Sequence, residues 1–185
     1  MIAYSSISQV GYIYVGLGLG NLGGVIAAIF HIFMHGAVKA MLFISVGGLA
    51  EVSEEKTAWS KLTGAGHRNK MAGIAFTASA IAMIGIPLFG GFISKILFAT
   101  AAVDNNMIKM VITLLALAVS TMLNAWYFFK AIICIYTPSG KEEKTKKPTW
   151  LYVAVMAGFI VLNVFLGVMS DVVIEGIEAG IGMFI

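Results

Sequence analysis

Apolar stretches long enough to cross a membrane recur along the whole chain and are separated by short polar segments. A membrane-spanning helix needs about 20 mainly apolar residues, and simple stretches of this kind cover 3–20, 24–50, 107–136 and 150–169. A further apolar region, 71–103, is too long for one straight helix. It contains GIPLFGG at 85–91, where Pro87 and the glycines Gly85, Gly90 and Gly91 are expected to interrupt the backbone hydrogen bonds. The pattern predicts an all-α, polytopic membrane helix bundle of about five spans, one of them a discontinuous helix.

Composition agrees with a single transmembrane domain over 1–185. Hydrophobic residues make up 59% of the chain and charged residues 11%, and the mean hydropathy of +0.94 excludes an ordinary soluble domain. The last residues, 171–185, are too acidic and too rich in glycine to predict a sixth span. The net charge is +3, without the basic and aromatic patch typical of nucleic-acid binding. Nucleic acid is therefore excluded as a partner.

Basic residues gather in two loops, 51–70 and 138–149. These loops hold eight of the 12 lysines and arginines: Lys56, Lys61, Arg68, Lys70, Lys141, Lys144, Lys146 and Lys147. Two predicted spans separate the loops, so both fall on one side of the membrane. By the positive-inside rule that side is cytoplasmic, and the N-terminus is expected on the same side. The lysine-rich segment 141–147 is most simply a solvated loop, with contact to anionic membrane lipid as an alternative.

Two lysines, Lys39 and Lys95, lie inside apolar regions rather than at their ends. A charged lysine at the centre of a membrane costs about 2.5 to 3.5 kcal/mol even on insertion scales. No aspartate or glutamate lies within an apolar span of this chain to pair with them. Burial lowers the pKa of a lysine, which turns it into a group that can take up and release a proton. Lys130 differs, because it lies near the end of its span and can extend to the interface.

Further polar residues accompany these lysines. His31, His35 and Lys39 follow one another at four-residue intervals and so lie along one side of a helix. Two neighbouring spans carry polar stripes that can support a path, and Ser94 directly precedes Lys95; the supporting set is Ser5, Ser8, Gln9, Tyr12, Ser94, Ser120, Asn124 and Tyr127. Such stripes usually face the interior of a bundle, where they can hold water. Simple helix packing explains the stripe of the first span equally well, and Gly16 and Gly20 on the same face favour close helix approach.

Other interpretations of these residues stay open. The spacing of His31 and His35 suits a metal site, but the one other histidine, His67, lies in a loop, so no metal is predicted. A haem held by two histidines would normally take its ligands from two helices. Both histidines can also serve only as hydrogen-bonding groups between helices. Pro87, in turn, can merely kink a packed helix.

Three segments resemble one known family. AYSSISQVGYIYVGLGLG at 3–20, HIFMHGAVKAMLFISVGGL at 31–49 and IAMIGIPLFGGFISKILF at 81–98 are similar, in the same order, to segments of antiporter-like, proton-translocating membrane subunits. These subunits occur in respiratory complex I, in Mrp-type sodium/proton antiporters and in membrane-bound hydrogenases. The resemblance implies that His31, His35 and Lys39 belong to a central hydrophilic axis. It also implies that Lys95 is the lysine of the discontinuous helix.

The resemblance covers only the later, C-terminal portion of the family's fold, which contains two inverted five-helix repeats. It implies partners: other membrane subunits of an ion-pumping complex, with a separately encoded N-terminal half as one candidate. It also implies a multi-pass protein of a prokaryotic plasma membrane. Protons are the expected cargo, and sodium stays open.

The sequence thus predicts proton translocation through a relay of buried lysines and histidines. No cofactor and no catalytic chemistry of its own are expected, and any redox step would belong to partner subunits. One alternative is a structural or assembly subunit that no longer conducts protons. Another is a metal- or haem-dependent membrane oxidoreductase.

Overall fold

The computed structural model describes residues 1–54, 58–138 and 147–183. Within these residues the chain forms helices and no strands, which confirms the all-α prediction for the described part. The helices are α1 (Ile2–Leu19), α2 (Leu22–Glu51), α3 (Trp59–Leu62), α4 (Ala65–Arg68), α5 (Lys70–Ile84), α6 (Gly90–Val103), α7 (Met107–Tyr136), α8 (Trp150–Val168) and α9 (Ser170–Gly182). Residues 55–57, 139–146 and 184–185 lie outside the description, and with them Lys56, Lys141, Lys144 and Lys146 of the predicted loops.

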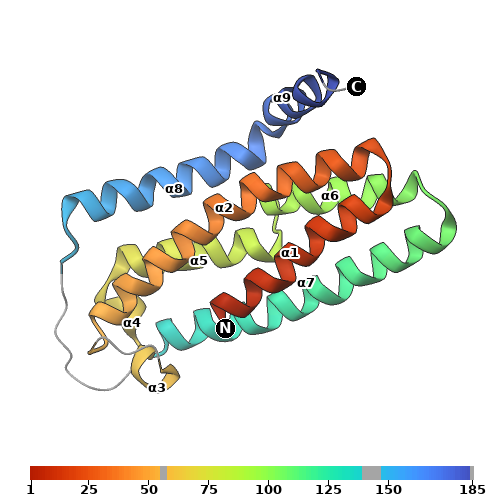
Figure 1. Ribbon diagram of the computed structural model, residues 1–185. Coiled ribbons are helices and arrows are strands. Elements are labelled where there is room, and N and C mark those ends of the chain that lie inside the picture. Colours follow the sequence, from red (N-terminus) through yellow and green to blue (C-terminus); the bar gives the residue numbers. More distant parts are fainter. Residues whose placement is uncertain (55–57, 139–146, 184–185) are drawn as a thin grey trace.

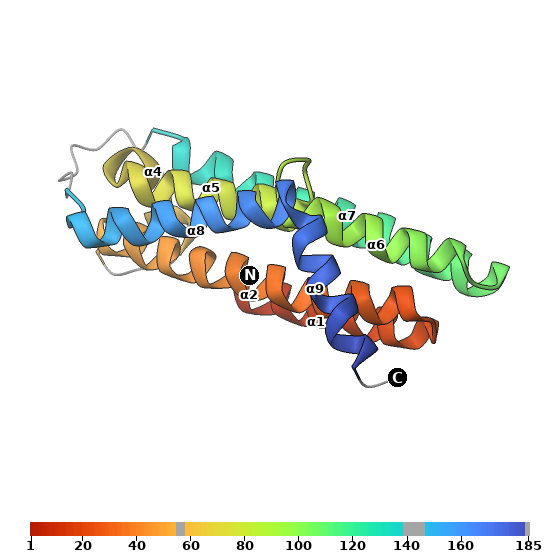
Figure 2. The ribbon, with the colours of Figure 1, turned by 90° about the horizontal axis from the view of Figure 1, so that it is seen from above.

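The long helices run side by side in an elongated bundle (Figure 1). Helix α9 leaves this arrangement and crosses the bundle at a steep angle, as Figure 2 shows. Of the described helices, α2, α7 and α8 are each long and apolar enough to cross a membrane, whereas α5 and α6 are shorter apolar helices. The structure therefore supports a membrane bundle with three candidate spans.

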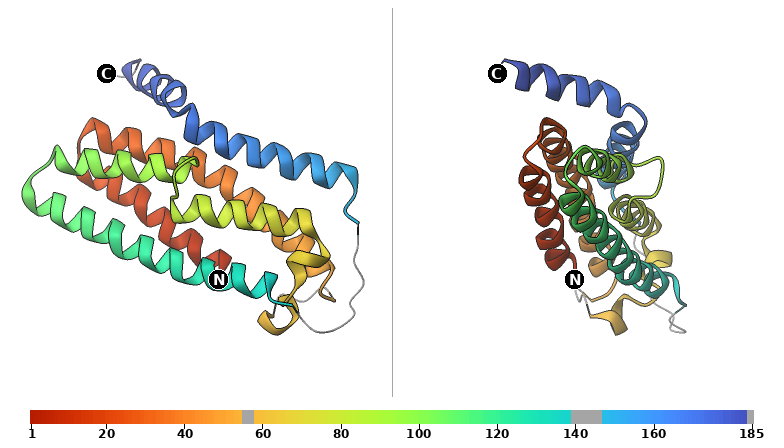
Figure 3. Two further views of the ribbon diagram at one scale, coloured as in Figure 1. Left: turned by 180° about the vertical axis from the view of Figure 1, so that it is seen from behind. Right: turned by 90° about the vertical axis from the view of Figure 1, so that its right-hand side faces the viewer.

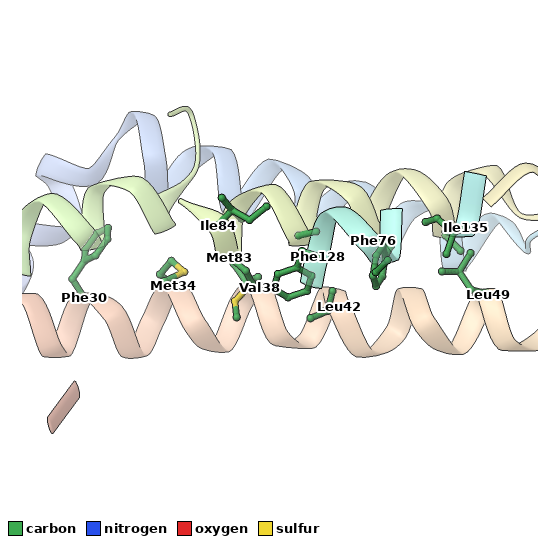
Figure 4. Packing of buried hydrophobic residues seen from close by; sticks show 14 of the residues in the cluster. Phe30, Met34, Val38, Leu42, Leu49, Phe76, Met83, Ile84, Phe128 and Ile135 are labelled. Atoms are coloured by element: carbon green, nitrogen blue, oxygen red, sulfur yellow. The ribbon is translucent and has the colours of Figure 1, made fainter. Parts of the chain in front are cut away.

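Helix α2 is the centre of the bundle and packs against α1, α5, α6, α8 and α9. One stripe of its side chains enters the apolar core. Figure 4 shows this stripe facing residues of α5 and α7, the labelled set being Phe30, Met34, Val38, Leu42 and Leu49 of α2, Phe76, Met83 and Ile84 of α5, and Phe128 and Ile135 of α7. The polar residues His31, His35 and Lys39 each follow a stripe residue by one position, about 100° further around the helix. Packing of the apolar stripe therefore fixes where the polar row faces.

Helices α1 and α2 form a tight hairpin. A Cβ atom added to Gly16 would lie 2.6 Å from the Gly24 carbonyl oxygen and 2.7 Å from Cε1 of Phe98, so glycine permits this close approach. At the turn, the Asn21 side chain accepts a hydrogen bond from the Gly24 amide at 2.9 Å and donates one to the Ala101 carbonyl at 2.8 Å. The hairpin is thereby tied to α6.

The helical structure is interrupted between α5 and α6. Helix α5 ends at Ile84, Gly85 adopts a left-handed φ of 85°, and α6 begins at Gly90. Pro87 lies in the connecting segment, and Leu88 has an unusual positive φ of 92°. A Cβ atom on Gly91 would collide with the backbone carbonyl of Ala82, so the two helices meet with almost no space between them. Figure 3 shows the connection as a loop beside α8.

The described parts of the two basic loops lie at one end of the bundle, and the loop 51–70 contains the short helices α3 and α4 (Figure 1). Arg68 is buried there and donates hydrogen bonds to the carbonyl oxygens of Val52, Lys61 and Thr63 and to the hydroxyl of Ser53. This end is therefore a folded cap. Its location in the cytoplasm stays a prediction.

Candidate proton-relay site

Lys39 is buried between α1 and α2, with 7% of its surface exposed. Its ammonium nitrogen donates to the Ile2 carbonyl oxygen at 2.8 Å and to the Ser5 hydroxyl at 2.6 Å. Ser5 in turn donates to the same Ile2 carbonyl at 2.8 Å. The nitrogen also lies 5.9 Å from the centre of the Phe43 ring, within the range of a cation–π contact. The first turn of α1 thus covers the amine with neutral acceptors.

Lys95 extends from α6 back across the break. Its ammonium nitrogen donates to the carbonyl oxygen of Ile84, the last residue of α5, and to the Thr121 hydroxyl of α7 at 2.8 Å. The C-terminal carbonyls of a helix carry partial negative charge, so this end of α5 favours a cation. Gly85 gives the side chain room, because a Cβ atom there would lie 2.9 Å from Cδ of Lys95. The break therefore supplies the acceptor that Lys95 uses.

His31 and His35 occupy the space beside these lysines. His31 is buried, and its Nδ1 lies 2.7 Å from the Ser94 hydroxyl. Its ring packs edge-on against Tyr12 and Phe98 and stacks on His35 at a centroid distance of 5.9 Å. Nε2 of His31 and Nδ1 of His35 are both buried without a hydrogen-bond partner in the described structure. The two rings stack without a direct hydrogen bond between them.

The predicted polar stripes of α1 and α7 meet each other. The hydroxyls of Ser8 and Ser120 lie 3.2 Å apart, Asn124 donates to Ser120 at 3.5 Å, and Tyr127 donates to the Asn124 side-chain oxygen. These four residues and Ser5 line a groove of about 420 Å³ between the two helices. Ser5 also accepts a hydrogen bond from Lys39, so one residue of the groove contacts this buried amine.

Gln9 and Tyr12 face inward from α1. Nε2 of Gln9 and the hydroxyl of Tyr12 are buried and have no partner in the described structure, as is the case for the two histidine nitrogens. Buried polar groups without partners are rare and usually bind ordered water. Hydroxyls and imidazoles both donate and accept hydrogen bonds, so a hydrated set of such groups can pass a proton along.

Among the polar residues that were not predicted for the site, Thr121 and Asn163 lie in the membrane helices α7 and α8. Thr121 contacts Lys95, and the signal that points to it is its position directly after Ser120 in an otherwise apolar helix. Asn163 is fully buried on α8, donates to the Phe159 carbonyl at 2.8 Å and leaves its own side-chain oxygen without a partner. An amide within the most hydrophobic span is the signal that points to it.

Metal ligands do not gather in the described part of the chain, where no group of three or more His, Cys, Asp or Glu side chains could hold an ion.

Comparison with known proteins identifies the family. The family model described as "NADH:quinone oxidoreductase/Mrp antiporter, TM" matches residues 1–123, about two thirds of the chain. The chain belongs to this family. The resemblance noted in the sequence is therefore confirmed, and the protein is an antiporter-like membrane subunit.

Individual relatives come from several kinds of complex. The chain is 33% identical over 153 residues to NADH-quinone oxidoreductase subunit N of Desulforudis audaxviator (strain MP104C), covering 80% of this chain and 30% of the relative. It is 30% identical over 177 residues to the putative antiporter subunit mnhD2 of Staphylococcus aureus (strain JH9), covering 94% and 34%. A chain in the structure of the membrane-bound sulfane sulfur reductase, an archaeal respiratory membrane complex, superposes with a TM-score of 0.81 at 31% identity, covering 95% and 35%. The chain spans about a third of the length of the curated relatives that it matches.

Proposed function

We propose that this chain moves protons as a membrane subunit of a multisubunit ion-pumping complex, with Lys39 and Lys95 gaining and losing protons in turn. The main observation in support of the proposal is the set of groups that surrounds the amines of Lys39 and Lys95. Both are held by carbonyl and hydroxyl oxygens, and no carboxylate among the described residues lies within ion-pair distance of either. Neutral acceptors offset only part of the cost of a charge in a membrane, so each amine is suited to exist in both charge states.

The histidines join the two lysines in this proposal. Lys39 and His35 are one turn apart on α2, His35 stacks on His31, and His31 binds Ser94, the residue next to Lys95. The row therefore leads from the amine on α2 to the helix that carries the second amine. Water bound to the unpartnered histidine nitrogens would bridge the gaps along the row. A change in the charge of one group then alters the proton affinity of the next.

The interruption between α5 and α6 forms part of the proposed proton path. We treat the two helices as halves of one discontinuous membrane span and α1 as a further span, and with the three candidate spans α2, α7 and α8 this makes the five spans that the sequence predicts. Broken helices are tolerated within a membrane where protein or water covers the free backbone groups, and they mark ion paths in transporters. Here Lys95 covers the Ile84 carbonyl. The N-terminus and the basic loops then face the cytoplasm of a prokaryotic cell.

The partners follow from the family and from the extent of the match. Relatives carry names of respiratory oxidoreductase and antiporter subunits, and this chain matches about a third of their length. We therefore propose other membrane subunits of an ion-pumping complex as partners. Protons are the proposed cargo, and sodium is the second ion to test for coupling in an antiport cycle.

Alanine substitutions test the proposal. Lys39→Ala and Lys95→Ala should each lower proton flux by about tenfold or more in vesicles containing the purified complex, because each removes a protonatable group. The matched control is Lys130→Ala, since Lys130 is exposed on α7 and its nitrogen lies 6.0 Å from the centre of the Trp59 ring. Subunit content of the purified complex is measured for every variant. Full flux in either Lys39→Ala or Lys95→Ala would rule out the proposed relay through both lysines.

A structural role is the second candidate function, and one contact favours it. Lys95 binds the last carbonyl of α5 and so stabilises the break, which a subunit that conducts no protons would also need. In that case Lys95→Leu lowers the yield of assembled complex, and the complex that does assemble pumps normally. The proton relay predicts the reverse, namely normal assembly with reduced pumping.

A further inference from the structure

Thr121 of α7 is a partner of Lys95 that the proposed relay does not yet use. The Lys95 nitrogen has two hydrogen-bond acceptors within the described structure, the Ile84 carbonyl and the Thr121 hydroxyl at 2.8 Å. The two acceptors differ chemically. A carbonyl oxygen can only accept a hydrogen bond, whereas a hydroxyl can accept one and donate one.

This difference matters because Lys95 is proposed to change its charge. A lysine ammonium has three N–H donors and no acceptor. After loss of a proton, the neutral amine has two N–H groups and a lone pair, which requires a donor. The Ile84 carbonyl cannot supply one. Thr121 can, by rotating its O–H toward the nitrogen while its backbone and methyl group stay in place.

The position of Thr121 also connects Lys95 to a second part of the site. The preceding residue, Ser120, contacts Ser8 of α1 at 3.2 Å and lines the groove between α1 and α7. Two adjacent hydroxyls on α7 thus face two different neighbours, one toward the amine on α6 and one toward the polar groove. Thr121 therefore lies where the break and the groove meet.

We propose that Thr121 is a positioning residue for Lys95, whose hydroxyl accepts from the charged ammonium and donates to the neutral amine, so that the side chain stays at the break in both charge states. This inference rests on the proposed proton relay. One covalent bond breaks, the N–H bond of the Lys95 ammonium, and the hydrogen bond between Lys95 and Thr121 reverses its direction. The proton released by Lys95 passes to the neighbouring polar groups of the relay.

Three substitutions on α7 test the hydroxyl. Thr121→Val removes it and keeps the shape of the side chain, and Thr121→Ser keeps it and removes a methyl group. Thr113→Val is the matched control, because Thr113 is buried on the same helix and has no hydrogen bond to a lysine in the described structure. Proton flux is measured in vesicles containing the purified complex over a range of pH, together with Lys95→Ala.

The expected result is a loss of flux of about tenfold in Thr121→Val, as removal of a hydrogen bond to a charged group predicts. Thr121→Ser and Thr113→Val should stay within about twofold of the unmodified complex. The pH profile of flux should be displaced in Thr121→Val alone, which a role in packing would not produce.

Four outcomes would overturn the inference. Thr121→Val with normal flux shows that the hydroxyl is not needed, and an equal loss in Thr121→Ser or in Thr113→Val points to packing of α7 instead. In these three cases a loss of flux in Lys95→Ala leaves the proton relay intact, so the two proposals can fail separately. Normal flux in Lys95→Ala would remove the relay and this inference with it.

Discussion

At the residue scale, four lysines of the bundle show that the surroundings of a lysine determine whether it suits a permanent charge or a change of charge. Lys109 donates to the Leu19 carbonyl at the end of α1, and Lys130 is exposed near the ring of Trp59. Lys39 and Lys95 instead direct their amines to carbonyls and hydroxyls between helices. A helix end or a surface accommodates a permanent charge, whereas the interior of a membrane bundle favours a group that can lose it.

Ser94→Ala tests the surroundings of His31. The serine hydroxyl is the hydrogen-bond partner of Nδ1 of the buried His31 ring, so its loss leaves this nitrogen without that partner. We expect the thermal stability of the purified protein in detergent to fall by an amount equivalent to about 1–3 kcal/mol. The control is Ser79→Ala, because the buried Ser79 hydroxyl donates to the Ala75 carbonyl of its own helix. Equal stability of the two variants would contradict the assigned contact.

The sequence points to candidate residues for the site, but not to the contacts that they make. A charged residue in an apolar stretch is conspicuous in any sequence, and this is why Lys39 and Lys95 could be proposed as candidates. Thr121 could not, because threonine is ordinary in an apolar helix and only the rotation of α7 against α6 turns it toward Lys95. The contact of Ser5 with Lys39 likewise depends on how α1 lies across α2.

At the element scale, the apolar pattern predicted where the long helices run, since α7 covers 107–136 as expected and α2 and α8 begin and end within two residues of the predicted limits. Proline and glycine predicted the interruption after Ile84. The short helices α3 and α4 within the loop 51–70 were not predicted. Tertiary contacts such as those of Arg68 hold them, and a periodic pattern cannot reveal such contacts.

Gly91→Ala tests the close approach of α5 and α6. A Cβ atom at this position would collide with the Ala82 carbonyl. Because both atoms belong to the backbone or are fixed to it, the collision can be relieved only if α5 or α6 moves. We expect a loss of stability of about 1–3 kcal/mol, measured by thermal unfolding in detergent. Gly158→Ala is the control, because a Cβ atom there meets no atom within 4 Å. Its stability should be unchanged or slightly raised. A variant at Gly91 as stable as the control would show that the two helices do not need this close contact.

At the scale of the whole molecule, composition and three sequence segments were enough to assign an all-α membrane protein to its family. The sequence does not show how far the proposed proton path extends. Whether polar groups on α1, α2, α6 and α7 form a connected route depends on the distances between helices, and the chain spans about a third of its curated relatives. The groove between α1 and α7 and the two stacked histidines on α2 are the two features that the proposed relay uses.

Replacement of Lys39 and Lys95 by arginine is the measurement that tests the central claim most directly. Arginine keeps the positive charge and stays protonated in proteins, so it preserves a structural cation but cannot release a proton. We predict that complexes with Lys39→Arg or Lys95→Arg assemble and show little proton flux in vesicles, while Lys130→Arg retains full flux. Flux at the unmodified rate in either Lys39→Arg or Lys95→Arg would show that the lysine at that position need not change its charge, and would contradict the account.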